Sequence, residues 1–595
     1  MPEFNNGVDT TLRSIAYFSM EIALENPMPT YSGGLGVLAG DTIRAAADMK
    51  VPMVAVSLLY RKGYFTQRLE ADGTQVEEPV EWEVEKFLKE EPARATLSLD
   101  GRAVELRCWR YSVKGVSGYE IPVYFLDADL PSNDPVNRAL TGTLYGGDKY
   151  YRLCQEVILG IGGVRILEAL GYSCLTRYHM NEGHASFLAV ELLNGEAKKA
   201  GRRSVRAEDV QKVRQKCLFT THTPVPAGHD TFPMEMIGRV FRERQDFLDP
   251  ADPVSAELLK DVLQEDAPVA TLGDAVRAGT HLNMTFLALL LSGYVNGVAK
   301  VHGETSRAMF SDLRIEAITN GVHAATWVSP PFQQLFDIHI HGWREDNFSL
   351  RAALGLPQEE IWQAHLAAKR RLFQAVRVKS GLTFDPEVFT VGFARRATGY
   401  KRADLILSDL DRLKDIAAKA GAFQIIFAGK AHPNDTSGKE IIRKIFRAKK
   451  ALRKDVRVVY LDDYNIELGG KMTAGVDLWL NTPEFPLEAS GTSGMKAALN
   501  GVPSLSVLDG WWVEGHIEGV TGWCVGEDHR EEKSGPGPKS EADSLYHKLE
   551  DIIIPLYYGQ RERYISVMQH AIALNGSFFH TQRMLQQYVT HAYFR

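Results

Sequence analysis

Short apolar runs alternate with amphipathic stretches along the second half of the chain. The runs are rich in Val, Ile, Leu and Phe, which favours buried strands, and the stretches between them repeat apolar residues at helical spacing. The pattern predicts strands at 389–393, 424–428, 456–461, 477–480 and 504–508 and helices at 405–420 and 440–452. This alternation predicts an α/β fold with helices on both faces of a parallel sheet. Ligands bind such sheets at the carboxyl ends of the strands, so we expect the chemistry in the residues that follow them.

The first half of the chain has a mixed pattern. It predicts strands at 13–18, 51–59 and 217–220 and helices at 151–170, 185–193 and 280–301. Alternating residues at 104–109 favour an antiparallel region inserted within 80–109. The interval between Asn320 and Asp385 contains Pro330-Pro331 and a further helical pattern, so we expect a domain boundary there.

Composition restricts the class of protein. The 595 residues are 45% hydrophobic and 24% charged, which is typical of a soluble globular protein and not of a disordered or collagen-like chain. The net charge of −7 disfavours a general nucleic-acid binder but leaves room for a local basic pocket for a small anion. The most apolar stretch, 286–291, is far shorter than the roughly 20 residues of a membrane span, and residues 1–13 have no apolar signal region.

The cysteines indicate the compartment. Their number is odd, none forms a C-x-x-C pair, and they are scattered through a long chain. They are Cys108, Cys154, Cys174, Cys217 and Cys524. This usage is typical of reduced core residues, so the expected location is cytoplasmic.

A glycine-rich stretch, 32–40, precedes a helical pattern at 41–49. Glycines allow backbone N–H groups to approach an anion at a helix N-terminus. The stretch is not a P-loop, because no Gly-Lys-Ser/Thr follows. An ordinary strand-to-helix turn explains the glycines equally well.

A run of cations follows the strand predicted at 389–393. Arg395, Arg396, Lys401 and Arg402 lie within eight positions. Such a run often marks only a solvated surface. Its place after a parallel strand favours a phosphate site instead, because guanidinium and ammonium groups together suit that anion.

Small residues surround a lysine in Glu488-Ala-Ser-Gly-Thr-Ser-Gly-Met-Lys496. Their size lets the backbone pass close to a ligand. A cation in the first turns of a helix is poorly placed for the helix dipole. The segment is therefore a helix cap with an incidental lysine, an anion site, or a site where a lysine of lowered pKa forms a Schiff base.

Histidines cluster in two short segments, Asn181-Glu-Gly-His184 and Thr221-His222-Thr223, with His229 nearby in sequence. The metal-binding spacing H-E-x-x-H is absent, and we expect no metal site. No nucleophile elbow G-x-S-x-G is present.

Together these segments resemble one enzyme family. The segment from Glu488 to Lys496, followed by Leu499-Asn-Gly501, closely resembles the pyridoxal-phosphate lysine segment of the α-glucan (glycogen, starch and maltodextrin) phosphorylases. Further segments agree in order: Tyr17-Phe-Ser-Met-Glu21, Ser32-Gly-Gly-Leu-Gly36, Val295-Asn-Gly-Val-Ala-Lys-Val-His302, Ile318-Thr-Asn-Gly-Val322, and Arg396 with Tyr400-Lys-Arg402. The resemblance spans about residues 15 to 525, and the lysine segment is its most specific part.

The resemblance implies a GT-B architecture, in which two Rossmann-like domains enclose the active site in the cleft between them. It implies an N-terminal domain at 1–320, a C-terminal domain at 321–575, and a final helix within 576–595 that packs back on the first domain. It also implies pyridoxal 5′-phosphate held as a Schiff base on Lys496. The implied reaction is reversible phosphorolysis of the terminal α-1,4-linked glucose of a glucan or maltodextrin, which gives α-glucose 1-phosphate with retention.

The resemblance also assigns residues. Arg396, Lys401 and the backbone of Gly33 and Gly34 would bind phosphate. Besides Lys496, cofactor contacts would come from Gly34, Gly491, Thr492 and Tyr464. The terminal glucose and its transition state would be contacted by Glu488, Ser490, Gly491, Asn320 and His222, with Tyr400 and His184 as further substrate contacts. Substrate phosphate supplies the general acid in this family, which agrees with the absence of an obvious carboxylate pair of the glycosidase type.

Some positions depart from the family pattern. Asn181-Glu-Gly-His184 stands where long members have Asn-Asp-Thr-His, which leaves Glu182 without an assigned role. The first family motif begins at Tyr17, so we do not expect allosteric control through a long N-terminal extension. Many family members are dimers, and a homodimer is possible here. Two alternatives remain: a nucleotide-sugar α-glucan synthase of the same architecture, and a carbohydrate-binding protein without activity.

Overall fold

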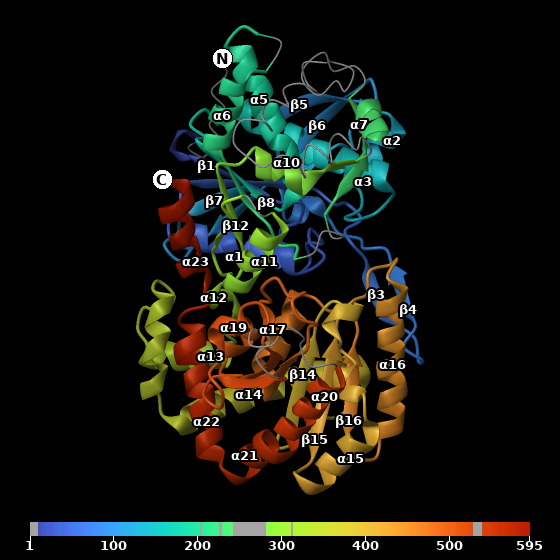
Figure 1. Ribbon diagram of the computed structural model, residues 1–595, viewed down its shortest axis with the longest axis vertical. Coiled ribbons are helices and arrows are strands. Elements are labelled where there is room, and N and C mark those ends of the chain that lie inside the picture. Colours follow the sequence, from blue (N-terminus) through green and yellow to red (C-terminus); the bar gives the residue numbers. More distant parts are fainter. Residues whose placement is uncertain are drawn as a thin grey trace.

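The computed structural model describes residues 10–202, 205–224, 229–241, 281–310, 313–526 and 538–594. Two sheets lie in separate halves of the chain, one above the other in Figure 1. We call the half with the first sheet the upper lobe and the half with the second sheet the lower lobe.

The upper lobe contains a nine-stranded sheet in the order β13-β12-β9-β8-β1-β2-β7-β6-β5. The pairs from β13 to β7 are parallel, and β6 and β5 add antiparallel strands at one edge. The strands are β1 (Ile15–Phe18), β2 (Met53–Leu58), β5 (Lys89–Leu99), β6 (Arg102–Lys114), β7 (Glu120–Asp127), β8 (Arg177–Asn181), β9 (Cys217–Thr220), β12 (Tyr294–Gly297) and β13 (Glu316–Ala317). The antiparallel edge confirms the region predicted within 80–109.

Both faces of this sheet are buried. Along β1, Ile15 and Tyr17 pack into one apolar cluster, whereas Ala16 and Phe18 pack into another on the opposite face. Successive residues of a strand point to opposite faces of the sheet, and because both faces are buried here, helices cover each of them. They include α1 (Gly34–Asp48), α2 (Pro135–Arg138), α3 (Lys149–Val157), α4 (Gly163–Ala169), α5 (Phe187–Lys199), α6 (Ala207–Lys216), α7 (Met234–Val240), α10 (Met284–Leu290) and α11 (Lys300–Met309).

The lower lobe contains a six-stranded sheet in the order β16-β15-β14-β17-β18-β19, and every pair is parallel. The strands are β14 (Phe389–Ala394), β15 (Phe423–Ala428), β16 (Arg457–Leu461), β17 (Leu478–Asn481), β18 (Ser504–Val507) and β19 (Gly522–Val525). Its helices include α12 (Ala324–Trp327), α13 (Pro330–His339), α14 (Gln358–Ser380), α15 (Leu410–Lys419), α16 (Thr436–Leu452), α17 (Ile466–Gly475), α18 (Ser493–Ala498), α19 (Trp512–Gly515), α20 (Pro538–His547), α21 (Ile554–Gly559) and α22 (Arg561–His570). All five strands predicted in this half are confirmed. The strand order reverses between β14 and β17, which is where ligands bind in such sheets.

A hairpin joins the two lobes. Strands β3 (Thr66–Leu69) and β4 (Gln75–Glu78) reach from the upper lobe alongside α16 of the lower lobe (Figure 1). Gln75 exchanges hydrogen bonds with the backbone of Ala431 at 2.9 and 3.0 Å. Lys439 forms an ion pair with Glu77 at 2.8 Å. These polar contacts link the hairpin of the upper lobe to the lower lobe.

The end of the chain returns to the upper lobe. Helix α23 (Thr581–Tyr588) runs upward beside α1 in Figure 1, and its Met584, Leu585 and Tyr588 belong to the apolar cluster of β1 and β2. The Tyr588 hydroxyl accepts a hydrogen bond from Asn296 at 2.9 Å. The Tyr593 hydroxyl lies 2.8 Å from Nδ1 of His179.

One part of the sequence prediction for the upper lobe is wrong, and strand β8 was missed. The helix predicted at 280–301 is divided by strand β12, because this short segment pairs with β9 and β13 inside the sheet. Strand β8 was not predicted, because its polar residues break the apolar pattern. Those polar side chains have partners inside the fold: His179 lies 2.9 Å from the Thr220 hydroxyl.

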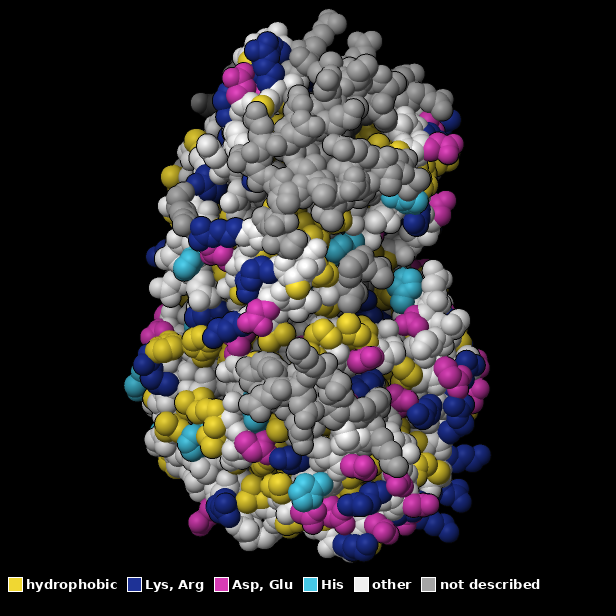
Figure 2. All heavy atoms as spheres, viewed as in Figure 1, with side chains coloured by type: hydrophobic (Ala, Val, Ile, Leu, Met, Phe, Trp, Pro, Cys, Tyr) yellow, Lys and Arg dark blue, Asp and Glu magenta, His cyan; other side chains and the backbone are white. Residues whose placement is uncertain are grey.

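No helix of the described residues combines the length and the apolar character that crossing a bilayer requires. On the face drawn in Figure 2, acidic and basic side chains of the lower lobe lie interspersed rather than gathered by sign.

Candidate active site

The glycine-rich loop lies between β1 and α1, with Gly33 as the N-cap of α1. The loop amides of Ser32 and Gly33 donate to Oε2 of Glu21 at 2.6 and 3.1 Å. Two of the N–H groups that the sequence offers to a phosphate therefore already bind a buried carboxylate. The first amides of α1, from Gly34 onward, have no acceptor within the helix. A Cβ at Gly34 would meet no atom within 4 Å, so the helix begins at open space.

Arg396 lies at this helix N-terminus, although it comes from the other sheet. A Cβ at Gly33 would be 3.5 Å from Nη2 of Arg396. Arg396 follows β14, is exposed, and forms no ion pair with any described residue. The fold thus brings a free guanidinium from the lower lobe to the glycine loop of the upper lobe, and both groups favour an anion.

A carboxylate gathers two of the other cations. Oε2 of Glu488 lies 2.6 Å from Nζ of Lys401 and 2.6 Å from Nη2 of Arg395. Burial alone would raise the pKa of Glu488, but the two cations outweigh it and lower that pKa to about 2. Glu488 is therefore ionised at neutral pH. Lys401 also lies over the Tyr400 ring, 4.5 Å from its centroid.

A second carboxyl group lies behind this cluster. Asp509 accepts hydrogen bonds from the amides of Glu488 and Gly510, each at 2.8 Å. Burial, together with the charge of Glu488, raises the pKa of Asp509 to about 7. Asp509 therefore holds the backbone of Glu488 and changes charge near neutral pH.

The fourth cation of the run, Arg402, has a different environment. Its guanidinium donates to the carbonyls of Thr482 and Pro483 at 2.9 and 2.7 Å and also contacts Glu541. Its backbone has a φ of +47°, a left-handed conformation that is uncommon outside glycine. Arg402 therefore fixes the loop after β17, and these partners occupy its guanidinium group.

Lys496 lies in α18, buried against α1 and α12. Its ammonium group is 3.8 Å from the centroid of the Trp327 ring and forms no hydrogen bond or ion pair with a described residue. Burial lowers the pKa of Lys496 to about 8, and the charge of Asp41 opposes this shift. Asp41 in turn accepts a hydrogen bond from Nε1 of Trp327 at 2.7 Å. An unpaired amine of this kind suits covalent attachment of a carbonyl cofactor.

The small residues before Lys496 let the chain pass close to Glu488 and carry hydroxyl groups. Gly491 has a φ of +74°, which favours glycine, and a Cβ there would be 3.3 Å from Oε1 of Glu488. The hydroxyl of Ser490 is buried and has no hydrogen-bond partner among the described residues. Thr492 is the N-cap of α18, and its side chain makes no capping bond. These polar groups are free to bind a ligand.

The ends of β8 and β9 bring the two histidine segments together. Nε2 of His222 lies 2.6 Å from Oδ1 of Asn181, whose amide group donates to the Ser19 hydroxyl at 3.0 Å. Ser19 donates to the Glu21 carbonyl, so its oxygen accepts from Asn181 and orients that amide. His222 consequently carries its hydrogen on Nε2 and presents a lone pair on Nδ1. Burial lowers the pKa of His222 to about 3, so the ring is neutral.

Glu182 holds the segment that contains His222. Its carboxylate accepts hydrogen bonds from the His222 amide at 2.8 Å and from the Thr223 hydroxyl at 3.0 Å. Its φ of +81° is strained for a residue with a side chain. Nε2 of His184 accepts from the Met20 amide at 3.0 Å, and burial lowers the pKa of His184 to about 3. His184 is therefore a structural acceptor that holds the end of β1.

Two further predicted site residues lie at the edges of this arrangement. Oδ1 of Asn320 is buried without a described partner, while its carbonyl accepts from Arg583 at 2.9 Å. Tyr464 follows β16, and burial raises its pKa to about 12 even though Arg395 lowers it. Neither residue directly contacts Lys496 or Glu488 in a described interaction, whereas Tyr464 lies within the electrostatic reach of Arg395.

The sequence placed Arg395 in the cation run that favours a phosphate site, but it assigned no site role to Glu21, Asp41, Trp327 or Asp509. These four residues act through partners that are distant in the chain, and no local pattern marks such pairs.

The described residues contain one group of three potential metal ligands, His516, Glu518 and Cys524. Glu518 already pairs with His516 at 2.8 Å and also with Lys548. Ion pairing therefore accounts for this group without a metal.

The fold and site together define an α/β protein in which cations, a helix N-terminus and a buried unpaired lysine lie between a mixed sheet and a parallel sheet. A family described as carbohydrate phosphorylase matches residues 172–522. The maltodextrin phosphorylase of Thermococcus litoralis is 37% identical over 97% of this chain and 70% of its own length. The glycogen phosphorylase of Aquifex aeolicus is 36% identical over 98% of this chain and 87% of its own, and that of Mycobacterium tuberculosis 36% over 97% and 70%. This chain belongs to the carbohydrate phosphorylase family.

Proposed function

We propose that the chain catalyses reversible phosphorolysis of the terminal α-1,4-linked glucose of α-glucans or maltodextrins and releases α-D-glucose 1-phosphate with retention. The observation that carries the proposal is the meeting of Arg396 with the glycine loop, where Nη2 would lie 3.5 Å from a Cβ at Gly33. This guanidinium has no carboxylate partner among the described residues, so it is available to inorganic phosphate. The named relatives support the same activity and give no support to the synthase alternative.

The residues at Lys496 fit pyridoxal 5′-phosphate. The amine is buried and unpaired, its pKa is about 8, and Thr492 offers a hydroxyl without a described partner. Lys496 would hold the cofactor covalently, and Gly491, Thr492 and Tyr464 would surround it. When bound, the cofactor supplies a phosphate group that exchanges a proton or charge with substrate phosphate.

The chain's own residues would organise the reaction around substrate phosphate. Arg396, Lys401 and the first amides of α1 bind the phosphate dianion and place one oxygen beside C1 of the terminal glucose. The bond between C1 and the glycosidic oxygen breaks, the phosphate oxygen bonds to C1, and the phosphate proton passes to the leaving glucan oxygen. Preorganised cations stabilise the phosphate groups throughout this exchange.

The sugar side of the site would use neutral groups. His222 presents a lone pair on Nδ1 to a glucose hydroxyl. Ser490 and Asn320 each have a buried oxygen without a described partner, which suits hydrogen bonding to the same sugar. Glu488 positions Lys401 and adds negative charge beside the glucosyl transition state. Tyr400 flanks Lys401 and would contact sugar or phosphate.

We further propose the GT-B architecture, with domains at 1–320 and 321–575 and a return of 576–595 to the first domain. The strand order of the lower sheet supports it, because it has the reversal at the first strand that is typical of a Rossmann-like domain. A cytoplasmic location and a homodimer remain predictions.

Phosphorolysis of a maltooligosaccharide ladder tests the proposed activity. With inorganic phosphate, we expect glucose 1-phosphate and a ladder shortened by one glucose at a time. Glucan extension from ADP-glucose without any phosphorolysis would contradict the proposal.

A further inference from the structure

A separate pocket of about 470 Å³ lies at the edge of the upper lobe, on the side of β7. The loop after β2, the short helix α2, the turn 139–143 and the start of α3 line it. Its charged lining residues are Arg61, Lys62, Arg138 and Asp129, which gives three cations and one carboxylate. The residues assigned to the candidate active site do not line this pocket.

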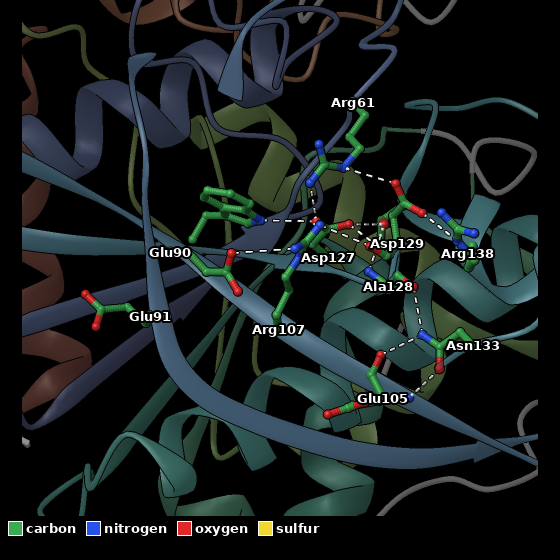
Figure 3. Close-up of polar contacts among 12 residues, drawn as sticks. Arg61, Glu90, Glu91, Glu105, Arg107, Asp127, Ala128, Asp129, Asn133 and Arg138 are labelled. Atoms are coloured by element: carbon green, nitrogen blue, oxygen red, sulfur yellow. Dashed lines mark hydrogen bonds and ion pairs between the residues drawn. The ribbon is translucent and has the colours of Figure 1, made fainter. Parts of the chain in front are cut away.

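Carboxylates hold the two arginines from behind. Asp127 is fully buried and accepts hydrogen bonds from Nη2 of Arg61 at 2.7 Å and from Nε of Arg107 at 2.8 Å. Asp129 accepts from Nε of Arg138 at 2.8 Å and lies 3.6 Å from Nε of Arg61. Figure 3 shows Arg61 and Arg138 converging on Asp129 from opposite sides. Each guanidinium thus has a fixed orientation and keeps further N–H groups unused.

Lys62 adds a charge that the protein does not neutralise. Its side chain is exposed and forms no ion pair with a described residue, while its amide donates to the Gly142 carbonyl at 2.8 Å. The backbone of Lys62 is therefore fixed although its ammonium group is free. Arg61 and Arg138 each pair with a carboxylate, so Lys62 is the lining cation that no carboxylate of the described residues neutralises.

Small residues keep the pocket open. Gly142, Gly146 and Gly147 line it, and Gly147 has a φ of +73° that favours glycine. A Cβ at Gly147 would lie 2.6 Å from the ring of Tyr151, whose hydroxyl donates to the Ala139 carbonyl at 2.9 Å. The ring is thus held as one wall, and a larger residue at Gly147 would displace it.

We propose that this pocket binds the dianion of a small phosphomonoester. The unneutralised ammonium group of Lys62 favours an anion, and the guanidinium groups of Arg61 and Arg138 bind phosphate oxygens with directional hydrogen bonds. The volume is large enough to hold a metabolite-sized ligand. Lys62 and Arg138 provide the direct charge contacts, and Asp127 and Asp129 preorganise the arginines.

Isothermal titration with glycerol 2-phosphate tests the proposal. This phosphomonoester has no anomeric carbon, and the titration is done in an Arg396→Gln background to weaken binding at the candidate active site. We expect saturable binding of one ligand per chain. Lys62→Gln and Arg138→Gln should each weaken it about tenfold or more, as loss of a charged hydrogen bond does.

Arg239→Gln is the matched control. Arg239 forms an exposed ion pair with Asp100 at 2.9 Å outside the pocket, and its removal should leave binding unchanged. Lys62 is exposed and free of ion pairs, so Lys62→Gln keeps the fold, which a melting curve checks. Absence of saturable binding up to about 10 mM overturns the proposal. The proposal is also overturned if Lys62→Gln and Arg138→Gln bind glycerol 2-phosphate as tightly as the parent protein does. It is overturned as well if the protein binds maltoheptaose but not glycerol 2-phosphate and Arg138→Gln abolishes that maltoheptaose binding.

Discussion

The ammonium group of Lys401 lies 2.6 Å from Oε2 of Glu488. Lys401 belongs to the loop after β14, and Glu488 precedes α18, so this contact joins the two sides of the strand reversal. A second cation, Arg395, binds the same oxygen at 2.6 Å. One buried carboxylate therefore holds two cations at the point where phosphate is expected to bind.

Replacing Glu488 with Gln should strongly destabilise the protein. The variant leaves two largely buried cations without their carboxylate, which costs about 3 kcal/mol of the free energy of unfolding. Urea denaturation at pH 7 measures this loss. Glu360→Gln is the control, since Glu360 pairs with His339 in an exposed contact.

The same variant should change the response to acid. The folded pKa of Glu488, about 2, lies below the unfolded value near 4.5. The stability that it contributes is present above pH 4.5 and is lost as the pH falls toward 2. The difference in stability between wild type and Glu488→Gln should therefore shrink over that window. A stability difference that does not change with pH would show that the negative charge of Glu488 does not stabilise the folded protein.

The ionisation of Asp509 should change stability with pH in the opposite direction to that of Glu488. Its folded pKa, about 7, lies above its unfolded value near 3.8, so the folded protein binds more protons between these values. Stability relative to Asp509→Asn should fall as the pH rises from 5 to 7, at up to about 1.4 kcal/mol per pH unit, and level off above. Urea midpoints across this range give the measurement. The exposed Asp543→Asn provides the comparison, and a flat difference for Asp509→Asn would refute the proposed titration.

Attachment of pyridoxal 5′-phosphate to Lys496 should be fast near neutral pH. Because burial lowers the pKa of Lys496 to about 8, the reactive neutral amine forms well below the pH that a free lysine requires. Protein freed of cofactor should bind it at a rate that rises with pH and levels off above about 8. Borohydride reduction and peptide mass spectrometry locate the product, and Lys496→Ala should yield none.

Asp41→Asn provides a directional check on that profile. The charge of Asp41 raises the pKa of Lys496, so its removal should move the midpoint of the attachment rate to lower pH. A shift to higher pH, or attachment at a different lysine, would contradict the assignment of Lys496.

Arg396→Gln should affect mainly phosphate binding, and Arg402→Gln should affect mainly the stability of the fold. Arg396 has no ion-pair partner among the described residues, so its loss should raise the KM for phosphate about tenfold or more with little change in melting temperature. Arg402 donates to two backbone carbonyls, so its loss should lower the melting temperature. Steady-state kinetics and calorimetry on both variants test this contrast. A large KM effect confined to Arg402→Gln would reverse the two assignments.

Buried neutral histidine should make the fold sensitive to acid. Burial, together with Arg152, lowers the pKa of His184 to about 3, below the unfolded value near 6.5. The unfolded chain binds more protons between these values, so the free energy of unfolding falls as the pH falls through this window. His184→Gln should flatten the decline, whereas the exposed His547→Gln should not. Equal slopes in both variants would exclude this origin.

Parts of the site were readable from the sequence because they lie within single segments. The cation run after β14 and the small residues before Lys496 each follow a strand, and the strand pattern showed where to look. Strand β8 escaped prediction because His179 and Asn181 are polar and find their partners, Thr220, Tyr593, Ser19 and His222, only in the folded sheet.

The sequence by itself determined the lower sheet, the family and most of the candidate residues, because apolar periodicity and contiguous motifs are local properties of a chain. Only the tertiary structure decided which of those residues meet. It joined Arg396 to the glycine loop, paired Glu488 with Lys401 and Arg395, and turned Arg402 toward the backbone. It also placed Asp41 and Trp327 around Lys496. These relations depend on burial and on distances between segments that are far apart in the chain, and charge and pKa follow from that packing.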